Sequence, residues 1–327
     1  MMRLTKTLKA LSLAAGLTLA AGAASAPDAR AAELGATDEP IKLAMLEWTG
    51  AHVTTRIAGH ILQEMGYQVE YVTAGNYPHH AAVADGTIHA SLEVWLNNAG
   101  DIYPKMKESG GLVDIGLLGL ETNEGWLYPV HMKELCPGLP DWKALEACAE
   151  KMATAETFPK GRILSYPADW GTRSADMIAG LDLPYSAVPA GSEGALVAEL
   201  RAAVAAEKPL VMMFWGPHWA LAEFETEWVA LPEYDPACTE DASWGPNPNA
   251  INDCGVDRPD VMKTAWSGFE AQWPAAWKFL EAFQMDKDEQ AKLMLAIDKD
   301  GEDLDAVTKA WVAENQAVWR PWVDAAM

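Results

Sequence analysis

Five tryptophans in this chain stand where a ligand could reach them. Trp48, Trp95, Trp170 and Trp215 end expected strands or follow them closely, and Trp126 lies where the chain first passes between two α/β segments. In open α/β sheets, ligands bind beyond the carboxyl ends of the strands. One such tryptophan is more often a core residue, but several at equivalent places favour convergence on one cleft.

Indole rings gathered in a cleft suit a cationic ligand. The face of a tryptophan ring attracts a cation by about 0.5–2 kcal/mol, and quaternary ammonium is the usual beneficiary. Such a group has no N–H to donate, so aromatic faces replace hydrogen bonds. Three or four rings, with burial of the ligand's methyl groups, can supply micromolar affinity. The sequence thus predicts a pocket for a methylated ammonium compound.

The other end of such a ligand needs hydrogen-bond donors. Gly171 and Thr172 stand at the start of an expected helix, where free backbone amides bind an anionic oxygen. His218 follows the Gly-Pro turn of "PLVMMFWGPHWAL". It either donates a further hydrogen bond to the ligand or has a purely structural partner.

Two glutamates stand beside these tryptophans. Alternation along "IHASLEVW" puts Glu93 on the same face of its strand as Trp95. Glu93 then either points toward the cation or accepts a structural hydrogen bond from a neighbouring loop. Both interpretations also hold for Glu47, next to Trp48.

The remaining tryptophans are interpreted without a role in binding. The chain contains 15 tryptophans, and two groups of three recur at helical spacing, which favours packing on one helix face. These groups are Trp266, Trp273 and Trp277, and Trp311, Trp319 and Trp322.

Strands and helices alternate in two sets along the chain. The first set comprises strands at 41–48, 68–73 and 87–96 and helices at 53–66 and 79–86. The second set comprises strands at 161–167 and 209–215 and helices at 172–181 and 192–207. Three helical segments then end the chain.

This β-α-β-α-β rhythm predicts an α/β fold of two lobes, each a doubly wound, mainly parallel sheet. The chain is expected to cross between the lobes twice, near 120–126 and 225–232. Lobe 1 is predicted to contain residues 34–123 and 228–327, and lobe 2 residues 124–227.

The first residues predict export. Arg3, Lys6 and Lys9 precede a short apolar stretch, and Ala29-Arg30-Ala31 offers a cleavage site, so residues 1–31 are interpreted as a signal peptide. The apolar stretch is too short to cross a bilayer. The mature protein is expected in the periplasm.

The charge of the mature chain excludes some partners. Residues 1–31 hold four basic residues and one acidic residue, so their removal changes the formal net charge from −23 to −26. A surface that acidic repels nucleic acid and anionic lipid.

Four cysteines in an exported chain indicate two disulfides. The local pairings are Cys136–Cys148 and Cys238–Cys254, although three connectivities are formally possible. Neither pair has the C-x-x-C spacing of a metal site, and no metal or cofactor is expected.

Catalysis and cation binding are the rival interpretations. No G-x-S-x-G nucleophile elbow occurs, and His79 and His80 are adjacent rather than spaced for a metal. "DKDGEDLD" (298–305) resembles part of an EF-hand loop, but Lys309 stands at its twelfth position, so a helix start is favoured. The acidic loop 233–260 is a weaker candidate for a structural cation.

The chain resembles the substrate-binding proteins of glycine betaine/proline-type ABC importers, a subgroup of the type II periplasmic binding proteins. The resemblance covers nearly the whole mature chain. It rests on "VADGTIHASLEVWLNN", "PADWGT", "FWGPHWAL" and the terminal "WVAENQAVWRPW", with weaker support from "ILQEMGYQVEYV". It implies a non-enzymatic, monomeric two-lobed clamp that delivers its ligand to a membrane permease and its ATPase.

By position, the resemblance implies that Trp95, Trp170 and Trp215 form the cage. Gly171 and Thr172 match a loop whose amides hold the ligand's carboxylate, with Thr172 at a position where one branch has cysteine, and His218 matches a ligand-contacting histidine.

Two departures from the family pattern bear on the ligand. Trp48 and Trp126 enlarge the aromatic set, and Glu93 and Glu47 add acids that a zwitterion with its own carboxylate does not need. Trimethylamine N-oxide and glycine betaine are therefore joint leads, with choline or carnitine as alternatives. A sensory binding protein would have the same sequence features.

Overall fold

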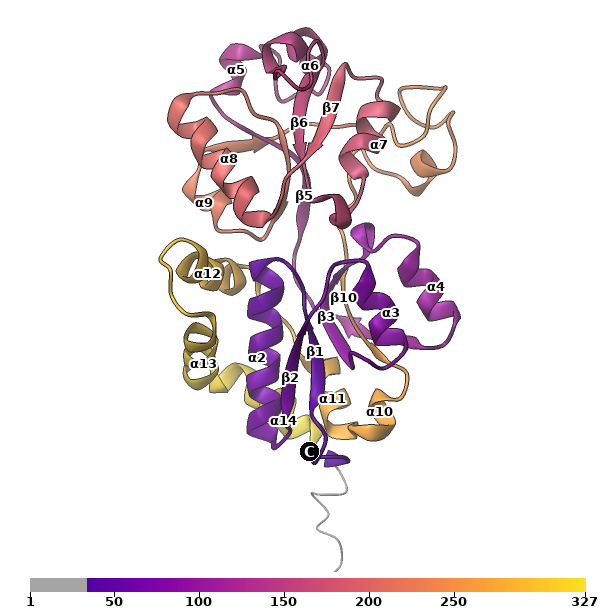
Figure 1. Cartoon of the computed structure of the whole chain (residues 1–327), viewed down its shortest axis with the longest axis vertical. Coiled ribbons are helices and arrows are strands. Elements are labelled where there is room, and N and C mark those ends of the chain that lie inside the picture. Colours follow the sequence, from indigo (N-terminus) through magenta and orange to yellow (C-terminus); the bar gives the residue numbers. More distant parts are fainter. Residues whose placement is uncertain (1–33) are drawn as a thin grey trace, which may run out of the picture.

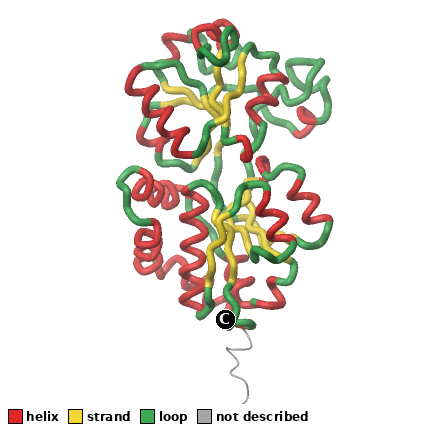
Figure 2. The backbone as a smooth tube through the Cα atoms, in the orientation of Figure 1, coloured by secondary structure: helices red, strands yellow, loops and turns green. Residues whose placement is uncertain are grey.

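The computed structural model describes residues 34–327, so the expected signal peptide lies outside the described residues. Two α/β lobes stand one above the other, joined by extended passages of the chain (Figure 1). In each lobe a sheet runs through the middle with helices against it (Figure 2). The two-lobed α/β fold is confirmed. No helix within 34–327 is long and apolar enough to cross a membrane.

The first lobe is built on a five-stranded sheet in the order β2-β1-β3-β10-β4. Its strands are β1 (Ile41–Met45), β2 (Val69–Thr73), β3 (Ala90–Trp95), β4 (Leu112–Leu117) and β10 (Val261–Trp266). Its helical segments are α2 (Thr49–Met65), α3 (Pro78–Ala84), η1 (Leu96–Asn98), α4 (Ile102–Glu108), α10 (Phe269–Gln272), α11 (Pro274–Ala282), α12 (Lys287–Asp298), α13 (Leu304–Glu314) and α14 (Gln316–Ala326).

The second lobe has a five-stranded sheet in the order β7-β6-β8-β5-β9. Its strands are β5 (Asn123–Pro129), β6 (Gly161–Ser165), β7 (Tyr185–Pro189), β8 (Met212–Gly216) and β9 (Thr226–Trp228). Its helical segments are α5 (Met132–Leu135), α6 (Ala144–Cys148), η2 (Ala149–Met152), η3 (Ala168–Trp170), α7 (Arg173–Gly180), α8 (Glu193–Ala206), α9 (Ala220–Glu223) and η4 (Pro236–Thr239).

Each sheet is mixed, because the strand that arrives from the other lobe runs against its neighbours. β10 is antiparallel to β3 and β4, and β5 is antiparallel to β8 and β9. Asn123 pairs with Gly216, and Val261 pairs with Trp95. Each arriving strand therefore begins where its neighbour ends, at the edge of the sheet that faces the other lobe.

The α2 helix shows how the sequence produces these elements. Its apolar residues Val53, Ile57 and Ile61 recur at helical spacing and are fully buried. Gly66 ends the helix at φ 111°, a left-handed conformation that glycine adopts without a Cβ clash. The helix begins directly after Trp48, which fixes that tryptophan between β1 and α2.

Both expected disulfides are present, Cys136–Cys148 and Cys238–Cys254. The loop closed by the second one packs against the second lobe beside α7 (Figure 1). Asn247 Nδ2 donates to the carbonyl of Gly180 (2.7 Å), and Arg173 donates to the side chain of Asn252 (3.0 Å). The sequence predicts that the chain returns to the first lobe at residue 228, and the structure shows that it does not. It returns between residues 255 and 261, because these contacts hold the loop on the second lobe.

Candidate ligand-binding site

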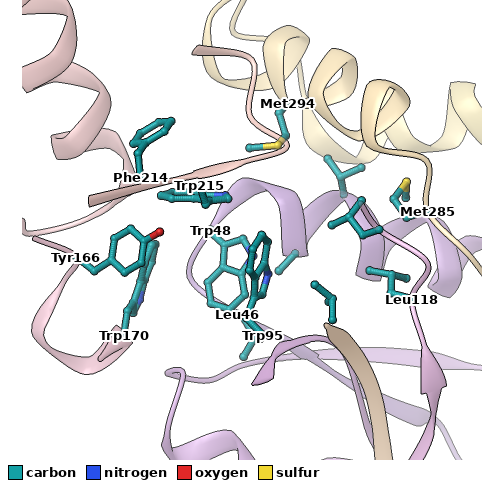
Figure 3. Packing of buried hydrophobic residues seen from close by; sticks show 14 of the residues in the cluster. Leu46, Trp48, Trp95, Leu118, Tyr166, Trp170, Phe214, Trp215, Met285 and Met294 are labelled. Atoms are coloured by element: carbon teal, nitrogen blue, oxygen red, sulfur yellow. The ribbon is translucent and has the colours of Figure 1, made fainter. Parts of the chain in front are cut away.

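A cavity between the lobes is walled mainly by aromatic rings. It encloses about 340 Å³ of empty space, part of it open to solvent. Its lining residues are Trp48, Asn76, Trp95, Asn98, Glu124, Tyr166, Trp170 and Trp215. The four indoles and the Tyr166 ring lie together between the ribbons of the two lobes (Figure 3). Four of the five tryptophans singled out in the sequence thus meet in one place.

These tryptophans meet because each stands at the carboxyl end of a strand. Trp48 follows β1, and Trp95 is the last residue of β3. In the second lobe, Trp215 is the penultimate residue of β8, and Trp170 ends η3, the short turn after β6. Both sheets present these ends to the cleft, as expected for ligand sites in open α/β sheets.

The rings are arranged edge to face rather than stacked. Trp48 and Trp170 come from different lobes, and their ring centroids are 5.3 Å apart at 70°. Trp170 and Trp215 are 5.8 Å apart at 74°, and Tyr166 packs on Trp215 at 5.6 Å and 75°. Edge-to-face pairs are favoured by the ring quadrupoles, and they leave ring faces free to meet a cation.

Glu93 does not line the cavity, contrary to one interpretation of the sequence. Its carboxylate is buried behind the first-lobe indoles, where Oε1 accepts hydrogen bonds from Nε1 of Trp48 (2.6 Å) and of Trp95 (3.2 Å). Oε2 accepts from Thr54 (2.7 Å) and Gln290 (2.8 Å). Glu93 therefore fixes both rings and does not itself touch the cavity.

Glu124 is the acidic group of the cavity, and the sequence interpretation missed it. Its Oε1 accepts a hydrogen bond from Nδ2 of Asn98 (2.8 Å), and its Oε2 accepts one from Asn97. Burial raises the pKa of Glu124, although these amides, the Tyr166 hydroxyl and the charge of Arg173 oppose the shift. Its signal was faint, because Glu124 is one of two acids, with Glu121, in the segment 120–126 that crosses between the lobes.

Tyr166 was also missed by the sequence interpretation. Its hydroxyl is buried next to Glu124 and has no hydrogen-bond partner among the described residues. Burial, followed by the charge of Glu124, raises the pKa of Tyr166 well above its usual value. The hydroxyl therefore remains protonated and is able to donate. It lies within the predicted strand 161–167, one residue after β6 ends at Ser165, where a tyrosine could have been noticed.

Trp126 is not part of the cavity, which corrects the sequence prediction. It is fully buried, and its Nε1 donates to Ser174 Oγ (3.1 Å). Alternation along β5 puts Trp126 on the same face as Glu124, but two residues, or about 6.8 Å, deeper into the lobe. It therefore belongs to the core of the second lobe.

His218 also lies outside the cavity, behind Trp215. Its ring meets the Trp215 ring at 5.1 Å and 87°. Nδ1 accepts a hydrogen bond from the Ala220 amide (3.1 Å), and Nε2 lies 3.2 Å from Oε1 of Glu193. His218 thus supports a cage tryptophan from behind, and its structural interpretation is the one that the geometry favours.

The predicted amide loop does not reach the cavity either. Thr172 is exposed, and its hydroxyl donates to Asp176 (2.8 Å). Gly171 faces Asn98 at the boundary between the lobes, where an added Cβ would meet Asn98 Oδ1 at 3.4 Å. Neither Gly171 nor Thr172 lines the cavity. The turn η3 brings Trp170 to the cavity and then directs the chain away from it.

Contacts outside the cavity hold the lobes together. Glu193 of the second lobe accepts hydrogen bonds from the amide (2.8 Å) and the hydroxyl (3.0 Å) of Thr49 in the first. Trp219 Nε1 donates to Asp298 (2.9 Å), and Trp170 Nε1 donates to Glu47 (2.9 Å). Glu47 therefore holds a cage indole from across the cleft. These bonds describe a closed arrangement of the lobes.

One group within residues 34–327 has the residue types of a metal site, namely Glu193, His218 and Asp298. The Ala220 amide donates to Nδ1 of His218, which makes Nε2 the nitrogen that carries the proton. A protonated nitrogen cannot ligate a metal, so the group is better described as an interlobe contact. The loop 233–260 contributes no residue to this group, and the EF-hand-like segment 298–305 contributes only Asp298, while its Asp303 caps α13.

Comparison with known proteins identifies one family. Residues 39–314 match the OpuAC family, described as the substrate binding domain of ABC-type glycine betaine transport system. The chain is 29% identical over 294 residues to the trimethylamine N-oxide-binding protein of Pelagibacter ubique (strain HTCC1062), covering 87% of this chain and 90% of that protein.

Two solved structures share the fold. Lactococcal OpuAC, closed on glycine betaine, has a TM-score of 0.71 at 20% identity and covers 88% of this chain and 100% of its own. An ABC-transporter choline binding protein in complex with choline has a TM-score of 0.70 at 20% identity and covers 87% and 91%.

Proposed function

Since the chain belongs to the family of substrate-binding domains of ABC-type glycine betaine transport systems, we propose that its cavity captures a small methylated ammonium compound, with trimethylamine N-oxide as the first candidate. The bound ligand is then delivered to a membrane permease that works with an ATPase. The protein acts as a periplasmic monomer and returns its ligand chemically unchanged. The curated relative named for trimethylamine N-oxide supports this choice.

The indoles supply the cationic end of the site. Four indoles and one phenol ring line the cavity from both lobes, and a trimethylammonium group fits among ring faces without needing a hydrogen bond. Each desolvated ring contributes about 0.5–2 kcal/mol, so four rings provide several kcal/mol in addition to methyl burial. This part of the site suits trimethylamine N-oxide, glycine betaine and choline alike.

The buried carboxyl group of Glu124 in the cavity distinguishes among these ligands. Burial raises the pKa of Glu124, and an N-oxide would bind the protonated form, because that form donates a hydrogen bond to the ligand's oxygen. The Tyr166 hydroxyl offers a second donor. The carboxylate of glycine betaine has two oxygens that need donors, and neither Gly171 nor Thr172 lines the cavity to hold that carboxylate. Trimethylamine N-oxide therefore fits better than glycine betaine.

Choline is the second candidate, and the same residue favours it in its other protonation state. An ionised Glu124 would accept a hydrogen bond from the choline hydroxyl and attract its net positive charge. The two ligands thus require opposite states of one carboxyl group. Affinity for trimethylamine N-oxide should fall as pH rises through the pKa of Glu124, whereas affinity for choline should rise.

The deciding experiment is calorimetry with trimethylamine N-oxide, glycine betaine, choline and carnitine, repeated from pH 5 to pH 9. We expect trimethylamine N-oxide to bind tightest and to weaken at high pH. Glu124→Gln keeps a donor and should retain most of this affinity, whereas Glu124→Leu should lose at least tenfold, about 1.4 kcal/mol. Tightest binding of another ligand, or equal affinities in both variants, would overturn the assignment.

A further inference from the structure

Glu93 is a buried acid with four hydrogen-bond donors and no cation beside it. It is 1% exposed, and its donors are the two indole N–H groups of Trp48 and Trp95, the Thr54 hydroxyl and the Gln290 amide. Within residues 34–327, no lysine, arginine or histidine forms an ion pair with it. Buried acids normally require such a partner.

The donors around Glu93 favour its ionised form. An indole N–H can donate but cannot accept, so a proton on Oε1 would have no acceptor in either of its two ring contacts. On the other oxygen, the Gln290 contact is also an amide donor, which leaves the Thr54 hydroxyl as the one partner able to accept a proton from Glu93. Burial raises the pKa of Glu93, but hydrogen bonds from all four donors oppose this shift.

The indoles stand between this acid and the cavity. Trp48 and Trp95 line the cavity, and the N–H groups of both indoles donate to one oxygen of Glu93, which does not line it. A negative charge at the N–H edge polarises the ring, so that more electron density lies on the face that meets a cation. The negative potential of the carboxylate also reaches the cavity, because the buried rings of Trp48 and Trp95 lie between them and screen charge far less than water does.

We propose that Glu93 is the counter-charge of the ligand's ammonium group, acting through the rings of Trp48 and Trp95. This inference rests on the proposed function and deepens it. Glu93 is a positioning residue that also sets specificity, since it does not touch the ligand. It completes its ion pair only when a cation occupies the cavity.

The inference predicts a dependence on the ligand's net charge. Tetramethylammonium carries a full positive charge, whereas trimethylamine N-oxide carries a negative oxygen that partly cancels the attraction. Glu93→Gln keeps the shape and an oxygen that accepts from both indoles, but it removes the charge. We expect this variant to lose tenfold or more in affinity for tetramethylammonium and clearly less for trimethylamine N-oxide.

Calorimetry on the mature protein tests this with both probes, using Thr54→Val as the control. That variant removes one neutral donor but leaves the charge, so the ratio of the two dissociation constants should stay within about threefold of wild type. An equal loss for both probes in Glu93→Gln would mean that Glu93 serves geometry alone, and no loss would remove its role.

A second measurement needs no variant. Carbon-13 NMR of the Glu93 carboxyl group in the wild-type protein should show a carboxylate at pH 7, and a protonated acid there would overturn the inference. If the wild-type protein binds neither probe, the proposed function fails, and the inference fails with it. If it binds both and Glu93→Gln keeps the wild-type ratio, only the inference fails.

Discussion

At the scale of the residue, one side-chain type serves two purposes in this protein. The Trp215 indole lines the cavity, where its ring packs edge to face with neighbouring rings. The Trp273 indole is fully buried in the first lobe, and its Nε1 donates to the carbonyl of Ala36 (2.6 Å). The two residues therefore make a matched pair for separating binding from stability.

Trp170→Ala and Trp215→Ala should each weaken ligand binding by tenfold or more, about 1.4 kcal/mol, because each removes a ring face and its apolar contact with the methyl groups. Titration calorimetry measures this directly. Trp273→Ala should instead lower the free energy of unfolding by roughly 3–5 kcal/mol, which thermal denaturation shows as a lower melting temperature. The affinity of the folded protein should stay unchanged. Wild-type affinity in both cavity variants would contradict the cage.

The cage was visible in the sequence because each indole stands beside a recognisable strand end. Glu124 was not visible, since nothing in the crossing segment distinguishes an acid that faces the cavity from one that faces water. Trp126 was assigned wrongly for a related reason, because two residues of strand separate the cavity from the core. Sequence patterns specify which face a residue takes, but not how far along the strand the cavity extends.

At the scale of the element, the predictable parts are those with one apolar periodicity. The helices α7 and α8 fall within one residue of their predicted bounds, whereas α2 begins four residues earlier and β8 three residues later than predicted. β10 was missed because Lys263 interrupts its apolar run. The Lys263 ammonium is buried and donates to the carbonyls of Leu280 (2.6 Å) and Phe283 (2.5 Å) near the end of α11. A charge satisfied by distant carbonyls cannot be distinguished from an exposed one in the sequence.

The α3 helix should make the first lobe sensitive to acid. His79 and His80 are fully buried, and burial lowers their pKa values to about 4 and about 3. The unfolded chain takes up protons near pH 6.5, before the folded protein does, so stability is lost as pH falls below that value. The loss should approach about 1.4 kcal/mol per pH unit for each histidine until its folded pKa is reached.

Urea unfolding at pH 7, 5.5 and 4.5 measures this loss, and His80→Gln should reduce its slope by about one histidine's share. A matched control is His131→Gln, because His131 is a half-exposed histidine on the other lobe. The same slope in the wild type and in His80→Gln would show that acid acts on other groups.

At the scale of the whole molecule, closure depends on bonds that never touch the ligand. The hydroxyl of Thr49 lies between Glu193 of the second lobe (3.0 Å) and Asp298 of the first (2.7 Å). Burial, followed by the nearby charge of Glu193, raises the pKa of Asp298. The two lobes therefore meet at an acidic contact as well as at the cage.

Thr49→Val keeps the shape of this contact but removes the hydroxyl, and should destabilise the closed form by about 1–2 kcal/mol. Ligand affinity should weaken by about fivefold to thirtyfold, because binding and closure are linked. Calorimetry gives the affinity, and small-angle X-ray scattering should show a larger radius of gyration at equal ligand occupancy. Arg162→Met, which breaks an ion pair within the second lobe, should change neither.

The division of the cage between the lobes has a consequence for timing. Trp48 and Trp95 belong to one lobe, and Tyr166, Trp170 and Trp215 belong to the other. When the lobes part, each half of the cage keeps only its own contacts with the ligand. The residence time of the ligand then falls to that of a weak surface contact. A permease that separates the lobes thus receives the ligand without having to bind it more tightly than the closed protein does. Tight capture from dilute surroundings and rapid unloading at the membrane are then properties of one site at two instants.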